Sequence, residues 1–210
     1  MAIENSLDHI LNSKAKIAVI RLFVSKTNDF KASGRAVARL IRISAPAAHS
    51  ALKGLYNQKI VKLEIMGKQH IYALDNGSRI VEQILKPMFK REMGIKDEIK
   101  AWLIKQVRKT GLTNSIVSVL LYGSFQREKT SRFSDVDVAV VVKNERNKGK
   151  IEEIFLDDIS GKFAAYFRAH LDVYVQTGDE FRAKLKNNLP PVSTLMKSYS
   201  VIIGKEPLDI

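Results

Sequence analysis

The chain has 210 residues, of which 45% are hydrophobic, and it carries a formal net charge of +13. This length accommodates one large or two small domains with packed cores. The absence of cysteine excludes disulfides and thiolate metal sites, and the four histidines lack the spacing of a zinc site. The amino terminus lacks a signal core and no apolar run approaches a membrane span, so we expect a cytoplasmic protein.

The positive charge is densest in the first third of the chain. Residues 1–76 contain twelve lysines and arginines against five acidic residues, a balance of +7, which leaves +6 for the remaining 134 residues. A basic surface of this kind indicates a polyanionic partner. The alternative is a charge that serves only solubility.

The first third also shows the pattern of three helices followed by a hairpin. Apolar residues follow helical periodicity from Leu7 up to about Ser25. Ser33 is expected to cap a second helix, and Ser44 a third helix with Pro46 in its first turn. Residues 60–65 and 71–74 are typical of two short strands around the turn Met66-Gly67-Lys68-Gln69.

This order resembles the winged helix-turn-helix domains of ArsR- and MarR-like transcription regulators, and we assign it to residues 1–76. The resemblance implies binding of duplex DNA, with the third helix in the major groove and the wing on the backbone. The expected DNA-contacting residues lie on the second helix, the third helix and the wing: Arg35, Arg39, Arg42, His49, Ser50, Lys53, Lys62, Lys68 and His70. The alternative is a protein-docking or dimerisation module.

Residues 77–110 are expected to form a helical connector. Apolar residues recur at helical spacing from Ile80 to Val107, and Pro87 and Gly94 interrupt the pattern, which favours two helices or a kinked one. The apolar stripe is either core or a dimer seam. We expect it to pair with a second copy of the chain and to give a homodimer.

The most informative motif follows. An apolar run at 116–122, typical of a buried strand, leads into Gly123-Ser124, and after ten intervening residues Asp135-Val136-Asp137 opens a second apolar run. Residues two apart on a strand face the same side, so both carboxylates project together. Paired carboxylates favour Mg²⁺ or Mn²⁺, and a glycine turn beside them lets backbone N–H groups approach phosphate.

This spacing resembles the signature of the DNA polymerase β-like nucleotidyltransferase superfamily, and it is most similar to the minimal branch. The resemblance implies that Asp135, Asp137 and Asp172 are catalytic and hold two Mg²⁺ ions. It further implies that Gly123, Ser124 and Arg127 bind the triphosphate of an NTP. Glu128 departs from the family pattern, in which many members have glycine, and Lys129 stands where an acid is frequent.

The whole chain is therefore expected to be an α/β (α+β) protein. Helical spacing over 151–168 places a helix between the Asp137 strand and the Asp172 strand, within a nucleotidyltransferase domain at 111–210. The implied reaction passes an NMP group, with AMP from ATP expected, to an acceptor hydroxyl that the sequence does not identify. Two alternatives stay open. One is a nucleotide-responsive DNA-binding regulator without catalysis, and the other is an enzyme whose first domain, residues 1–76, docks a protein substrate.

Overall fold

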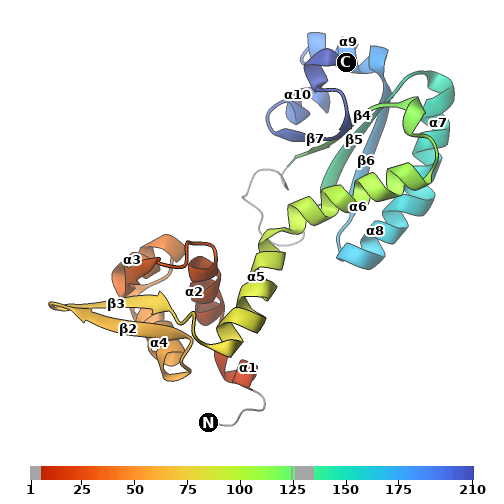
Figure 1. Ribbon diagram of the computed structural model, residues 1–210. Coiled ribbons are helices and arrows are strands. Elements are labelled where there is room, and N and C mark those ends of the chain that lie inside the picture. The colour runs from red at the N-terminus through yellow and green to blue at the C-terminus, as the bar shows by residue number, and fades with distance from the viewer. Residues whose placement is uncertain (1–5, 124, 126–134) are drawn as a thin grey trace. The chain divides into compact units, whose positions relative to one another are not determined.

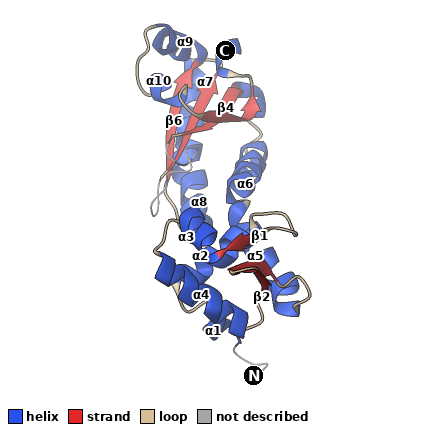
Figure 2. Ribbon diagram, turned by 90° about the vertical axis from the view of Figure 1, so that its left-hand side faces the viewer, coloured by secondary structure: helices blue, strands red, loops and turns tan. Residues whose placement is uncertain are grey.

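The computed structural model of the chain describes residues 6–123, 125 and 135–210. The chain divides into two compact units, residues 1–95 and residues 96–210. Their helices and strands are drawn in Figures 1 and 2. Across the described ranges, no helix is both long enough and apolar enough to cross a membrane.

The first unit opens with four helices that begin at capped positions or short turns. They are α1 (Ser6–Ile10), α2 (Lys14–Val24), α3 (Gly34–Ile41) and α4 (Ala45–Asn57). The Ser33 and Ser44 hydroxyls accept hydrogen bonds from backbone N–H groups three residues onward, at 3.3 and 3.4 Å, which confirms both predicted caps. The first predicted helix is instead two helices, because Ser13 caps α2 in the same way at 3.2 Å.

The same unit contains a three-stranded antiparallel sheet in the order β1-β3-β2. Strands β2 (Val61–Met66) and β3 (Gln69–Leu74) form the predicted hairpin, and Gly67 at φ +59° supplies the left-handed turn between them. Strand β1 (Lys31–Ser33) was not expected from the sequence, since three residues carry too little periodicity. Helices α2, α3 and α4 followed by this wing make a winged helix-turn-helix fold.

The expected connector is divided between the two units. A π-helical turn (Val81–Leu85) and α5 (Lys86–Met93) bury Val81, Leu85 and Phe89 in the core of the first unit, together with residues of α2 and α4. Helix α6 (Ile95–Lys109) buries Ile99, Leu103 and Val107 in the core of the second unit, each at 2% exposure or less. The apolar stripe is therefore core, and it does not argue for pairing with a second copy.

The second unit is built on a four-stranded mixed sheet in the order β6-β5-β4-β7. Its strands are β4 (Ile116–Tyr122), β5 (Val136–Val142), β6 (Leu171–Thr177) and β7 (Tyr199–Gly204). Only β5 and β6 run parallel, because a helical crossover joins them, whereas the other pairs are antiparallel. The crossover comprises α7 (Glu145–Glu153), a π-helical turn (Ile154–Ile159) and α8 (Ser160–Phe167).

Helices cover both faces of this sheet, as Figure 1 shows. One face packs against α6 and the crossover through a core that includes Leu121, Val138, Val140, Phe155 and Phe163. The other face packs through Leu120, Ala139 and Val141 against α9 (Gly178–Lys186) and α10 (Val192–Leu195). Because Asp137 has the same parity along β5 as Ala139 and Val141, it belongs to the α9 face.

Candidate active site and nucleic-acid interface

Four polar residues lie in one row across the sheet of the second unit. Tyr122 of β4 is in register with Tyr199 of β7 and with Asp137 of β5, and Asp137 is in register with Asp172 of β6. Residues directly opposite one another in a sheet share a face. The row therefore brings two predicted carboxylates side by side on neighbouring strands, although they are far apart in sequence.

Gly123 makes room for the central carboxylate of this row. It adopts φ +82°, and a Cβ atom built on it would lie 1.8 Å from Asp137 Oδ2 and 2.7 Å from Asp137 Cγ. No side chain other than hydrogen fits such a contact. The glycine of the motif thus has a second structural role beside the turn that the sequence indicated, because it lets the carboxylate lie directly against the backbone.

The proximity of these residues affects the electrostatics of the row. Burial raises the pKa of the Tyr122 phenol to about 12, and the negative charges of Asp137 and Asp172, followed by Tyr174, add to this rise. Tyr122 is only 7% exposed. The phenol therefore stays protonated near neutral pH, next to two carboxylates whose charge it cannot neutralise.

The third predicted carboxylate, Asp135, is not part of this row. Asp135 precedes β5 and is exposed, with Oδ1 4.0 Å from Nδ1 of His170, which is also exposed. The structure therefore brings Asp137 and Asp172 together and places Asp135 beside a histidine that the sequence analysis had not assigned. Within residues 6–123, 125 and 135–210, no three acidic, histidine or cysteine side chains are grouped closely enough to hold a metal ion.

The donor set nevertheless has the chemistry that a hard cation requires. Carboxylate oxygens are the preferred ligands of Mg²⁺, which keeps several waters and needs only one or two carboxylates together with substrate phosphates. Asp137 and Asp172 offer such a pair from two rigid strands, and Asp135 lies on the chain just before β5. Of the predicted phosphate-binding residues, Gly123 is described, whereas Ser124 and Arg127 lie outside the described residues, as do Glu128 and Lys129.

A second cluster lies in the first unit. A hollow of about 380 Å³ is bordered by the start of α3, by α4 and by the wing, and its lining includes Arg35, His49, Lys68 and His70. Four predicted DNA-contacting residues from three separate elements therefore converge on it. Of the described residues that line the hollow, none is acidic, and all four side chains are exposed. Such a concave basic surface suits a phosphate group.

The other predicted DNA-contacting residues do not line this hollow. Arg39 and Arg42 are exposed toward the end of α3, and Ser50 and Lys53 are exposed on α4. Lys62 is in register with Ala73, on the face of the wing opposite the buried Tyr72, and its Nζ lies 3.0 Å from Asp75. Lys62 already has an anionic partner in Asp75, so of these residues its role as a phosphate contact has the weakest structural support.

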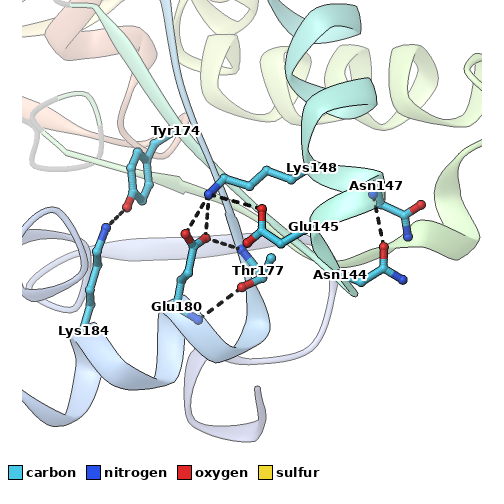
Figure 3. Close-up of polar contacts among 8 residues, drawn as sticks. All are labelled: Asn144, Glu145, Asn147, Lys148, Tyr174, Thr177, Glu180 and Lys184. Carbon is cyan, nitrogen blue, oxygen red and sulfur yellow. Dashed lines mark hydrogen bonds and ion pairs between the residues drawn. The ribbon is translucent and has the colours of Figure 1, made fainter.

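The sequence analysis left Tyr122, Tyr174 and His170 without a role. Tyr122 closes the strand before Gly123, and Tyr174 follows Asp172 by two residues on the same strand face. Of these, Tyr174 (Figure 3) carried a usable signal, because the strand period places it on the Asp172 face. The pairing of Tyr122 with Asp137 had no such signal, since it depends on the register of β4 against β5.

Comparison with known protein families gives a match to the second unit. The family described as Polymerase beta, Nucleotidyltransferase matches residues 104–174, about a third of the chain. The matched residues run from α6 into β6 and include Asp135, Asp137 and Asp172. No curated protein matches the sequence.

Comparison with solved structures gives neighbours of low sequence identity. Reduced HlyU from Vibrio cholerae N16961 is 14% identical, covers 40% of this chain and 83% of its own, and has a TM-score of 0.35. The homodimeric winged helix-turn-helix domain of Mb0332 from Mycobacterium bovis, a possible ArsR-family regulator, is 13% identical over 45% of this chain and 81% of its own, with a TM-score of 0.34. A toxin–antitoxin crystallised with AMP-PNP is 16% identical over 52% of this chain and 77% of its own, with a TM-score of 0.34.

Proposed function

We propose that this chain, in which residues 104–174 form a nucleotidyltransferase domain of the polymerase β type, transfers an NMP group from an NTP to an acceptor hydroxyl. AMP from ATP is the expected group. The observation that carries the proposal is the register of Asp137 with Asp172 on the α9 face of the sheet, beside a glycine whose missing side chain accommodates the Asp137 carboxylate.

The residues of the row would act as follows. Asp137 and Asp172, with Asp135 from the segment before β5, would hold Mg²⁺ or Mn²⁺, and the metal would supply positive charge to the phosphate oxygens. Asp172 is exposed and would accept the proton of the acceptor hydroxyl while the hydroxyl oxygen attacks the α-phosphorus. The bond between the α-phosphorus and the oxygen that bridges it to the β-phosphorus would break, and pyrophosphate would leave. Gly123, Ser124 and Arg127 would bind the triphosphate.

A labelled-ATP transfer assay tests this proposal directly. The full chain is incubated with Mg²⁺, ATP labelled on the α-phosphate and a cell lysate that supplies acceptors, and pyrophosphate release is followed in parallel. We expect labelled acceptor and pyrophosphate in equal amounts from the unaltered chain, and neither from the Asp135→Asn, Asp137→Asn double variant. Equal transfer by this double variant would refute the assignment, and labelling of a protein band would identify a protein acceptor.

The basic hollow supports a second candidate function, a DNA-binding regulator that responds to the nucleotide. Arg35, His49, Lys68 and His70 would contact backbone phosphates of a duplex, which gives an affinity that falls steeply with salt. The expected arrangement is a homodimer that presents two winged helices to paired half-sites. In this function the second unit binds NTP without transferring it.

Binding measurements separate the two functions. Duplex affinity of the full chain is measured by fluorescence anisotropy with and without Mg²⁺ and a non-hydrolysable ATP analogue. A regulator requires the nucleotide to change DNA affinity and cognate DNA to change nucleotide affinity by the same factor. Nucleotide transfer with DNA affinity unaffected by the analogue would favour the enzyme alone. Light scattering at tens of micromolar tests the dimer.

A further inference from the structure

The tip of the β2–β3 wing carries two large apolar side chains that the first unit leaves uncovered. Ile65 is 70% exposed and Met66 is 62% exposed, and both lie at the end of β2, directly before the turn that begins at Gly67. Figure 1 shows this hairpin extending away from the helices of its unit. Contact of such side chains with water is unfavourable, so apolar burial would stabilise a partner that covers the tip.

The register of the hairpin connects this tip to the basic hollow. Ile65 is in register with His70, and Met66 is in register with Gln69. Both partners line the hollow. Residues directly opposite one another share a face, so Ile65 lies on the same side of the wing as the His70 imidazole. The apolar tip therefore continues the basic surface along a single hairpin.

The charges around the tip favour a polyanionic partner. The hollow contributes four basic side chains, and of the described residues that line it none is acidic. Glu64 precedes Ile65 on the strand and therefore lies on the other face of the wing, where its carboxylate is 2.7 Å from Lys31 Nζ. A partner that matches both features has a row of negative charges with an apolar element beside it. Duplex DNA has this arrangement, since its stacked bases lie between two phosphate backbones.

The dimensions of the wing suit the minor groove. Three strand residues separate His70 from Gly67 and span about 10 Å, enough to pass from a phosphate at the hollow into the neighbouring groove. The two strands are about 4.8 Å apart, and the minor groove of B-DNA is about 6 Å wide. Ile65 and Met66 offer no hydrogen-bond donor to a phosphate, so the base steps are the part of the duplex that they can contact.

We propose that Ile65 and Met66 insert between base pairs from the minor groove of a duplex whose phosphates the basic hollow contacts, and that they bend this duplex. The inference rests on DNA binding, the second function proposed above. Apolar wedges of this kind partly unstack a base step and kink the duplex by about 20–90° toward the major groove. Pyrimidine–purine steps such as TA unstack most easily. The wing would thus select flexible sites without a hydrogen bond to any base.

Duplex binding by the full chain tests this inference, with two probes of equal length and base composition. One is an alternating TA duplex, rich in flexible steps, and the other is a stiff A-tract duplex. We expect the unaltered chain to bind the TA duplex about tenfold more tightly and to bring its labelled ends closer together, as measured by energy transfer. Ile65→Ser with Met66→Ser is expected to lose most of this preference and the bend. Its slope of log K against log salt should stay unchanged, because the substitution removes no charge.

The matched control is Leu156→Ser with Leu208→Ser, which replaces two apolar side chains of the second unit that are 56% and 76% exposed. This control should keep the preference and the bend. A wing-tip variant that also keeps both would overturn the inference. So would a wing-tip variant with a changed oligomeric state by light scattering, because the tip would then be a contact between copies. An unaltered chain that binds neither duplex at low salt would instead refute DNA binding itself, so the two failures are distinguishable.

Discussion

The two units build their candidate sites in different ways. In the second unit the site residues lie on paired strands, and the hydrogen-bond register sets their spacing, so that Asp137 faces Asp172 and Tyr122. In the first unit the basic residues come from a helix start, a second helix and a wing, and they meet only around a surface hollow. Strand register thus sets the relative positions of a few side chains in the second unit. In the first unit, side chains from separate elements bring positive charge to one surface hollow.

The largest expected effect concerns the rigid site. Asp137→Asn together with Asp172→Asn is expected to lower nucleotide transfer by about 10³-fold or more, equivalent to roughly 4 kcal/mol of transition-state stabilisation. DNA affinity of the same variant should be unchanged. The assay is α-phosphate transfer at saturating ATP, with the exposed Asp157→Asn as control. A residual rate above a tenth of the unaltered rate would show that the row is not the catalytic centre.

Gly123→Ala tests whether the close approach of backbone and carboxylate is required. The new Cβ would lie 1.8 Å from Asp137 Oδ2 at a φ of +82°, so both the carboxylate and the backbone must shift. We expect a loss of about 1–3 kcal/mol in the free energy of unfolding, together with a loss of transfer. Gly149→Ala in α7 is the matched control, because its Cβ meets open space. Equal stability of the two variants by urea unfolding would contradict this reading.

Alkaline pH offers a third test of the aspartate row. The folded pKa of Tyr122, about 12, lies above the ordinary tyrosine value, so the stability that the protonated phenol contributes is complete below about pH 10. It is lost as the pH rises through the folded pKa, and the loss amounts to roughly 2 kcal/mol. The measurement is the free energy of unfolding at about pH 9 and about pH 12. The free energy of unfolding of Tyr122→Phe should fall less between these two pH values than that of the unaltered chain. Identical falls would show that the pKa of Tyr122 is not raised by folding.

The smallest effect is expected for the basic hollow, where each charge contributes little and many act together. Arg35→Ala with Lys68→Ala should lower duplex affinity about tenfold at low salt and reduce the slope of log K against log salt by about 2. The matched control removes two lysines that already have partners, Lys31 at 2.7 Å from Glu64 and Lys62 at 3.0 Å from Asp75. Lys31→Ala with Lys62→Ala should change affinity less than about twofold. Equal losses in the two double variants would mean that net charge, not the hollow, determines binding.

Much of the fold was accessible from local patterns. The caps at Ser33 and Ser44, the hairpin around Gly67 and the alternation of strands and helices in the second unit are encoded by residues close in sequence. Local signals also predicted the strands that carry Asp137 and Asp172, since the β period of 2 and the spacing from Gly123 are short-range features. The three-residue strand β1 lies below the length at which periodicity is informative.

Tertiary structure decided what no local pattern contains. The sequence by itself determined the carboxylates, the glycine, the basic residues and their secondary structure, because helix and strand periods act over a few residues. Only the fold decided that the apolar stripe of 81–107 is core, that Lys62 pairs with Asp75, and that Tyr122 lies opposite Asp137. Those outcomes depend on strand register and on which surfaces exclude water, and both are set by contacts between residues distant in sequence.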